Sequence, residues 1–361
     1  MKKAPIIAIL LLALALQGRA QPAKPRYLLA LSKNDHTLAL VDPVSLKVVA
    51  KVPVGPDPHE VIASADGRTA YVSNYAGGSL HELDVIDLIN KKALPPVDTK
   101  PLIGLHGLAF AAGKVWFTAE GSKTVGRYDP QTDLVDWAMG TGQDRTHMIY
   151  VTPDGKHIYT TNVSSGTVSI LVDTLIKPGN FGPPPGGGGG GGNPPPPGGG
   201  GPPKGMHGPP PPHEDWSQTI VPVSRGSEGF GVSPDGKQLW TAAADDGSIA
   251  VIDLAAKKEI ARIDAKVLGA NRLAFTPDGK RVLVSSLRNG DVVVFDVATQ
   301  QPIKTISTGR GAAGILVDPD GSRAFIGCTA DNYVAVINLQ TLQVTGHIDV
   351  GGGPDGLGWA F

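Results

Sequence analysis

The sequence predicts an all-β protein: a seven-bladed β-propeller with four antiparallel strands in each blade. Three observations predict it. One strand–turn–strand unit occurs seven times, no amphipathic helical run follows residue 20, and the two chain ends supply complementary parts of one blade. The copies start at residues 59, 106, 147, 228, 271, 313 and 355, and successive starts lie 41 to 47 residues apart, with one exception.

Each copy carries two hairpins. The first is an apolar strand that ends in Asp-Gly, as in His147 to Gly155 and Glu228 to Gly236. The second contains an apolar strand that ends in Asp or Asn, for example Asp253 or Asp296. Such side chains bond backbone N–H groups two residues further on and favour a turn. Two hairpins per copy give the four strands of a propeller blade.

The chain ends predict how the ring closes. Residues 27–54 contain only three strands, the second to fourth of a blade, whereas residues 357–361 contain only a first strand. Together they make the seventh blade, and their pairing removes the open edges that a partial ring would leave.

The exceptional spacing follows the copy at 147, and its cause is visible. Residues 178–213 contain 14 Pro and 15 Gly in 36 positions. This composition cannot bury apolar area, so it predicts a flexible, partly polyproline insertion. It follows Asp173, the expected end of a third strand, which places it in the loop between the third and fourth strands.

Residues 1–20 have the composition of a secretory signal peptide. Lys2 and Lys3 precede an apolar run from Ile6 to Leu16, and small residues occupy positions 18 and 20. The run is too short to span a bilayer, so we expect a periplasmic or secreted protein without a membrane anchor.

Composition restricts the partners. Removing residues 1–20 removes three basic residues and no acid, which takes the formal net charge from −1 to −4. That balance argues against nucleic-acid binding, and we expect a monomer that binds a small molecule or a protein. The sole cysteine, Cys328, cannot form an internal disulfide, and its apolar strand predicts a buried small hydrophobe.

Several motifs resemble the YVTN-type β-propeller repeat family. They are Tyr71-Val-Ser-Asn74, the Pro-Asp-Gly-Lys turns, and the Val-Gly-x-x-Pro connections at 54–58 and 350–354. The resemblance covers essentially the whole chain after residue 20. It implies the propeller fold but no single activity, because that family looks like binding modules, scaffolds and a few enzymes.

Two narrower resemblances suggest chemistry. Residues 113–130 look like the blade motif of streptogramin lyases. The segment from Arg145 to Asn162 is similar to the Arg-His-x-x-Phe-x-Pro-Asp-Gly segment of propeller lactonases. It departs from that pattern in two places: Thr146 separates the Arg and the His, and Val163 replaces the Glu that follows Asn.

The first residue of each innermost strand is expected at the mouth of the central channel, on the face that carries the loops entering that strand. Read in order, these positions are His59, His106, His147, Glu228, Asn271, Ala313 and Asp355. Three imidazoles and a carboxylate suit a divalent transition metal such as Zn²⁺ or Cu²⁺.

We therefore predict His59, His106, His147 and Glu228 as metal ligands, with Glu228 also a candidate general base. Asn271 and Asp355 are candidate ligand-binding residues. The alternative is that these polar side chains merely line a wet channel mouth.

Three arginines lie in the loops that enter the innermost strands: Arg145, Arg225 and Arg310. Guanidinium groups there could clamp a carboxylate or phosphate, or they could be solvated rim residues.

These features favour an exported binding or scaffold protein with a metal or ligand at the histidine-rich mouth. One alternative is a metal-dependent lyase or lactonase that acts on a small molecule at the same site. Another is a pure protein–protein interaction module that uses the rim and the Pro/Gly-rich insertion.

Overall fold

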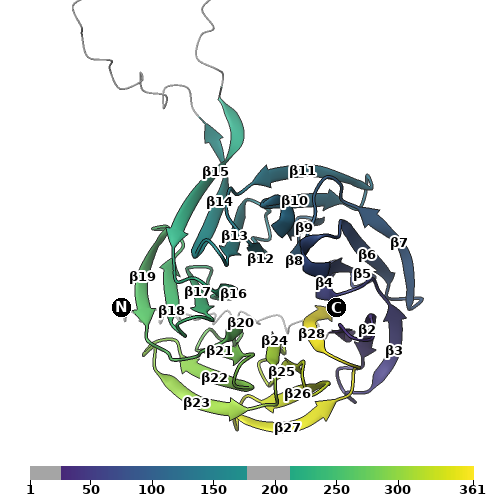
Figure 1. Ribbon diagram of the computed structural model, residues 1–361, viewed down its shortest axis with the longest axis vertical. Helices are drawn as coiled ribbons and strands as arrows, with labels where there is room; N and C mark the ends of the chain where they lie inside the picture. Colours follow the sequence, from purple (N-terminus) through teal and green to yellow (C-terminus); the bar gives the residue numbers. More distant parts are fainter. Residues whose placement is uncertain (1–25, 177–211) are drawn as a thin grey trace, which may run out of the picture.

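The computed structural model describes residues 26–176 and 212–361, and within these ranges the chain forms a seven-bladed β-propeller (Figure 1). Seven four-stranded antiparallel sheets surround one axis, as the sequence predicts. The described helices are two short 3₁₀ turns, η1 (Ala76–Gly78) and η2 (Glu120–Ser122). The expected signal peptide, residues 1–20, lies outside the described residues.

The strands of each blade are named A to D from the channel outward, and blades 1 to 7 follow the order of their A strands. The A strands are β4 (Pro58–Ala63), β8 (Leu105–Ala111), β12 (Thr146–Val151), β16 (Ser227–Val232), β20 (Ala270–Phe275), β24 (Ala312–Val317) and β28 (Pro354–Ala360). The B strands are β5 (Thr69–Asn74), β9 (Lys114–Ala119), β13 (His157–Asn162), β17 (Gln238–Ala243), β21 (Arg281–Ser286), β25 (Arg323–Cys328) and β1 (Tyr27–Ser32).

The outer half of each blade completes the sheet. The C strands are β6 (Glu82–Asp87), β10 (Thr124–Asp129), β14 (Thr167–Ile176), β18 (Ile249–Asp253), β22 (Asp291–Asp296), β26 (Tyr333–Asn338) and β2 (Thr37–Val41). The D strands are β7 (Lys92–Asp98), β11 (Leu134–Gly140), β15 (His213–Pro222), β19 (Lys258–Ile263), β23 (Pro302–Ser307), β27 (Gln343–Ile348) and β3 (Val48–Pro53).

Burial follows position in the blade. After its first residue the B strand β9 is wholly buried, whereas the D strand β11 alternates between exposed and half-buried residues. A strand covered on both faces reads as a continuous apolar run, and a strand with one wet face alternates. The core is divided into clusters between neighbouring blades, such as the one where Tyr71 and Leu83 of blade 1 meet Val115 and Phe117 of blade 2.

The chain ends close the ring. β28 pairs with β1, from Tyr27 opposite Ala360 to Ser32 opposite Pro354, so the C-terminal strand becomes strand A of blade 7. β28 begins at Pro354, three residues before the predicted start. Figure 1 shows this strand beside the channel, next to β4 of blade 1.

The third blade carries the longest hairpin. β14 and β15 pair over ten residues, from Thr167 opposite Pro222 to Ile176 opposite His213, and their outer ends project from the ring (Figure 1). Strand D therefore begins at His213 instead of near Gln218. The predicted insertion falls between these two strands, and residues 177–211 lie outside the described residues.

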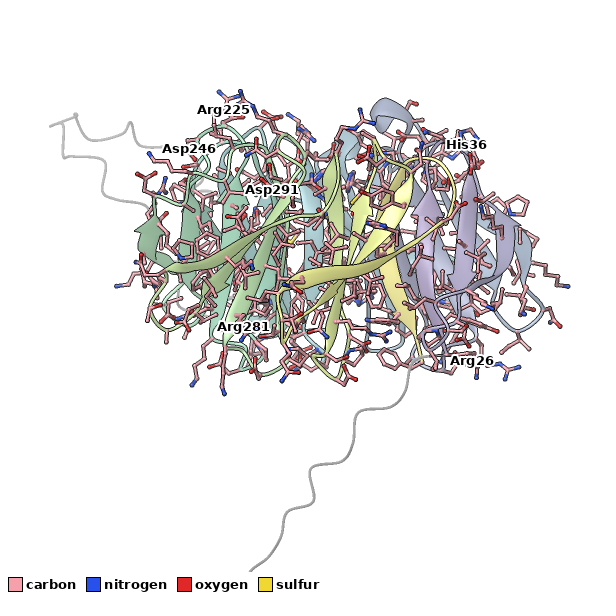
Figure 2. All side chains as sticks on the ribbon, turned by 90° about the horizontal axis from the view of Figure 1, so that it is seen from below. Arg26, His36, Arg225, Asp246, Arg281 and Asp291 are labelled. Carbon is pink, nitrogen blue, oxygen red and sulfur yellow. The ribbon has the colours of Figure 1, made fainter. Side chains whose placement is uncertain are left out.

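The two faces of the disc carry different connections (Figure 2). Arg225 in a D–A loop and Asp246 in a B–C loop lie on one face, whereas Arg281, which follows an A–B turn, lies on the other. The C–D turns use the expected carboxylates: Asp42 accepts hydrogen bonds from the backbone N–H groups of Val44 and Ser45.

Candidate functional site

The seven residues predicted at the channel mouth all line one cavity. The cavity has a volume of about 430 Å³ and receives at least one lining residue from every blade. The predicted residues are His59, His106, His147, Glu228, Asn271, Ala313 and Asp355. The repeat position alone therefore locates a pocket, and the described side chains decide its chemistry.

Contacts between blades fix where these residues sit. The Oγ of Ser73, in strand B of blade 1, donates a hydrogen bond of 2.6 Å to the backbone oxygen of His106 in blade 2. The Oγ1 of Thr118 bonds the backbone oxygen of His147 in the same way, at 2.5 Å. Gly107 packs so closely on the His147 backbone that a Cβ would clash with it. The two imidazoles are thus held by tightly packed neighbouring strands.

A buried cluster forms at one side of the cavity from His106, His147 and Glu120. One ligand atom from each lies within 4.8 Å of the others, so all three can approach one ion. His106 is 2% exposed and His147 is 3% exposed, and their ring centroids are 3.8 Å apart. Glu120 begins η2, in the B–C loop of blade 2. Two imidazoles and a carboxylate are a common donor set for zinc and for other divalent transition metals.

The hydrogen bonds of the cluster leave two buried imidazole nitrogens without a partner. Nδ1 of His147 contacts Oε1 of Glu120, and because a carboxylate only accepts, Nδ1 carries the proton. Nε2 of His147 and Nδ1 of His106 are buried and have no hydrogen-bond partner in the described residues. Buried polar atoms are normally paired, and a metal-ligating histidine typically donates its other N–H to a carboxylate.

The electrostatics keep the cluster ready to accept a cation. Burial and the neighbouring His147 lower the pKa of His106 well below its usual value, so its ring stays neutral. Burial alone would raise the pKa of Glu120, but hydrogen bonds from His147 and Tyr75 and the charge of Arg145 outweigh it and hold the pKa below its usual range. Burial and the 2.5 Å hydrogen bond to Glu120 raise the pKa of Tyr75 to about 12.

His59 lies next to the cluster but is engaged elsewhere. Its ring centroid is 4.7 Å from that of His106. The ammonium of Lys33 donates to its Nε2 at 2.8 Å, and its Nδ1 lies 3.0 Å from the backbone oxygen of Asp57. Both ring nitrogens of His59 therefore have partners, and its contribution as a third imidazole ligand stays a prediction.

Glu228 faces the cavity from blade 4, outside the cluster. Its Oε2 accepts a 2.6 Å hydrogen bond from the amide of Asn271, and its Oε1 lies 3.6 Å from the guanidinium of Arg145. This geometry points the Glu228 carboxylate into the cavity and not toward His106, His147 and Glu120. Glu228 is therefore better placed for a bound molecule than for the ion that His106 and His147 can reach.

Charged groups on the far side complete the walls. Lys33 donates to Oδ2 of Asp355 at 3.3 Å. Below the mouth, the guanidinium of Arg272 forms a 2.7 Å ion pair with Glu60, and this pair joins blades 5 and 1. Arg272 also lines the cavity.

Two of the predicted arginines do not reach the cavity. Arg225 is exposed, and Figure 2 shows it at the outer surface of the face that carries the D–A and B–C loops. Arg310 has a 79% exposed side chain whose Nε bonds Asp331 at 2.7 Å. Neither contributes to the cavity wall, so both are better described as rim residues. Arg145 lines the cavity as predicted.

Sequence reasoning missed Lys33, Tyr75 and Glu120. Each is the residue that directly follows a B strand, and the B–C loops lie on the same face as the A-strand starts. These positions therefore form a second ring of candidates, completed by Val163, Ala244, Leu287 and Thr329. A reading of this second repeat phase would have found Glu120. Glu120 follows strand B of blade 2, just as Val163 follows strand B of blade 3. The lactonase resemblance pointed to a Glu at the Val163 position, one blade further on.

A family model described as the cytochrome d1 haem domain matches residues 223–349, about a third of the chain. These residues belong to blades 4, 5 and 6 and the loop that precedes them. No curated protein matches the sequence. The matching family has a seven-bladed propeller fold, so this comparison supports the fold while the YVTN-type repeat family stays a prediction.

Similar solved structures share the fold at low identity. One is described as a functionally unknown protein from Desulfotomaculum acetoxidans DSM 771, with a TM-score of 0.69, 11% identity, and coverage of 93% of this chain and 99% of that one. Hydrazine synthase of Kuenenia stuttgartiensis has a TM-score of 0.62, 17% identity, and coverage of 89% and 93%. The dihydro-haem d1 dehydrogenase NirN has a TM-score of 0.60, 16% identity, and coverage of 92% and 66%.

No helix within residues 26–176 and 212–361 is long and apolar enough to cross a membrane.

Proposed function

We propose that this protein is an exported β-propeller that binds a divalent transition metal, such as Zn²⁺ or Cu²⁺, at the imidazoles of His106 and His147 beside Glu120, and through it a small molecule in the cavity. The observation that carries the proposal is the pair of buried, unpartnered nitrogens, Nδ1 of His106 and Nε2 of His147, beside a carboxylate. An ion would satisfy both nitrogens, which otherwise carry a desolvation penalty. Export follows from the composition of residues 1–20.

A tetrapyrrole fits the cavity less well than an ion. Haem is suggested by the description of the family model and of one structural relative. Ligand pockets for large flat cofactors are lined mostly by apolar side chains, but only Leu287, Ala313 and Ala330 supply aliphatic walls here. The matched segment contains one histidine, the exposed His347 on the outer strand β27, so it contributes no imidazole to the mouth. No step is therefore assigned to haem.

Isothermal titration of the metal-free protein with Zn²⁺ and with Cu²⁺ tests the proposal. We expect one ion per chain, with binding lost in the His106→Ala/His147→Ala double variant. The His347→Ala variant is the matched control, because its ring packs against Tyr333 on the outer strands and its loss should leave binding unchanged. His59→Ala separates the two candidate ligand sets: it should retain most of the affinity.

Three results would contradict the proposal. They are no metal binding by the parent protein, equal binding by the double variant, and a stoichiometric Soret shift on titration with haem that the double variant abolishes. The last result would replace the ion by a macrocycle at the same imidazoles.

Metal-assisted catalysis is the second candidate, because Glu228 faces the same cavity and Asn271 fixes its orientation. A carboxylate beside a metal site can act as a general base toward metal-bound water. A screen of lactones and esters with the metal-loaded protein tests this candidate. Activity that falls at least tenfold in Glu228→Gln, with metal affinity unchanged, would support it, and the absence of turnover would leave a binding protein.

A further inference from the structure

The loops that enter the A strands share one unusual backbone position. The residue directly before each described A strand has a positive φ in every blade. Five of these positions are glycine: Gly104 (φ 72°), Gly226 (φ 80°), Gly269 (φ 69°), Gly311 (φ 72°) and Gly353 (φ 63°). The other two are Asp57 (φ 53°) and Arg145 (φ 54°). The repeat therefore requires a left-handed residue here, and glycine is its ordinary solution.

Arg145 occupies this left-handed position in blade 3, where a glycine would make the folded state more stable. A residue with a Cβ is disfavoured in the left-handed region, and aspartate tolerates it better than arginine because a short polar side chain can bond locally. The carboxylate of Asp57 also forms a 3.2 Å ion pair with the ammonium of Lys33. Other non-glycine residues with positive φ, such as Lys91, lie in C–D turns, so what distinguishes Arg145 is that its side chain also lines the cavity.

The guanidinium of Arg145 lies in the cavity, where it is ion-paired with two carboxylates but donates no hydrogen bond in the described residues. Its Nε is 3.7 Å from Oε2 of Glu120, and one terminal nitrogen is 3.6 Å from Oε1 of Glu228. Both distances exceed a hydrogen bond, and none from this guanidinium is present among the described residues. The side chain is 42% exposed. A planar fork of free N–H donors matches the oxygens of a carboxylate or phosphate group.

We propose that Arg145 anchors the anionic group, a carboxylate or a phosphate, of the small molecule that binds in the cavity. This inference rests on the proposed function, because the bound metal changes the charge around Arg145. Without metal, Glu120 and Glu228 flank the guanidinium and oppose an incoming anion. A dication beside Glu120 competes for that carboxylate and adds positive charge, so metal loading favours the anion.

Metal and anion therefore bind cooperatively. Coupling between two sites is reciprocal, so the factor by which metal raises anion affinity is the factor by which the anion raises metal affinity. We expect a factor on the order of ten, within the usual range for coupled sites.

The variant Arg145→Gly restores the glycine of the repeat and removes the anchor. Its matched control is Lys91→Gly, which removes a positive charge from an exposed residue with φ 55° in the C–D turn of blade 1, on the opposite face. The probes are succinate and methyl phosphate, titrated into protein that is metal-free or loaded with one equivalent of Zn²⁺. Thermal unfolding of each variant is measured in parallel.

We expect Arg145→Gly to unfold at a higher temperature than the parent, to bind zinc at least as tightly, and to bind the anion at least tenfold more weakly when zinc-loaded. Lys91→Gly should also gain thermal stability but bind the anion as the parent does. The tighter of the two probes identifies the anionic group as a carboxylate or a phosphate.

The outcomes separate this inference from the proposed function. If zinc binds and Arg145→Gly keeps the parent's affinity for both probes, the anchor is overturned while the metal site stands. If the parent binds no metal, the proposed function fails, and anion binding by the metal-free parent that Arg145→Gly lacks would still support the anchor. Equal anion affinity with and without zinc would overturn the coupling.

Discussion

Ring closure makes a sharp prediction about two neighbouring aromatic residues at the C-terminus. The indole of Trp359 packs against Phe325 at 5.5 Å between centroids, and its N–H donates to the backbone oxygen of Val317 at 3.0 Å. Phe361 follows strand β28 and is 43% exposed. Trp359→Ala should therefore destabilise the protein, whereas Phe361→Ala is the matched control.

The magnitude follows from what each substitution removes. Truncating a buried aromatic residue costs about 3 to 5 kcal/mol, and the partly buried Trp359 belongs near the lower end, at about 3 kcal/mol. The lost indole bond contributes about 1 kcal/mol of this. Phe361→Ala should change the free energy of unfolding by about 0.5 kcal/mol or less. Since domains are stabilised by only about 5–15 kcal/mol, the first change is a large fraction of the total.

Urea unfolding followed by circular dichroism measures both variants. With a slope of about 3 kcal/mol per molar urea, Trp359→Ala should lower the midpoint by about 1 M, and Phe361→Ala should barely move it. Deleting Leu357 to Phe361 should cost more, because four of the five paired positions between β28 and β1 are lost. Equal midpoints for the parent and Trp359→Ala, or an unchanged midpoint after the deletion, would refute closure by the termini.

Three further predictions follow from the same structure. Zinc affinity should fall with decreasing pH, because protons compete with the ion for imidazole nitrogens. Burial and the neighbouring His147 hold the pKa of His106 well below 6.5, so this ligand should be lost only below that pH. Titration calorimetry across the acidic range checks this expectation. Burial raises the pKa of Cys328 to about 11, so the native thiol should resist iodoacetamide at mildly alkaline pH and react only in denaturant, as mass spectrometry would show; rapid native labelling would contradict the burial. Replacing residues 178–211 by a short Asn-Gly turn should leave the unfolding midpoint within error, because loop-closure entropy grows slowly with length; loss of folding or of metal binding would contradict a dispensable insertion.

The fold could be predicted from the sequence because propeller signals are local and repeated. An Asp-Gly turn after an apolar strand and a carboxylate after a third strand are set by backbone chemistry within a few residues. The same repetition placed on one cavity all seven residues predicted at the channel mouth, each the second residue of its A strand, including Ala313, which brings no chemistry of its own.

The repeat gives candidate positions, but which of these side chains are free to bind could not be predicted in the same way, because it depends on contacts between blades. Lys33, in the B–C loop of blade 7, donates a hydrogen bond to Nε2 of His59 in blade 1. The position of these two residues in the repeat does not predict that they pair. Glu120 reaches His147 across a blade boundary. Position in the repeat thus identified the mouth, and side-chain partners decided which residues there remain free to bind.

The most direct test of the central claim is a crystal structure of the zinc-loaded protein with anomalous data collected at the zinc edge. One anomalous peak within bonding distance of His106 and His147 and next to Glu120 is the result that the buried, unpartnered imidazole nitrogens predict. A peak between His59 and Glu228, or no peak in the channel mouth when the crystals are grown in excess zinc, would contradict it.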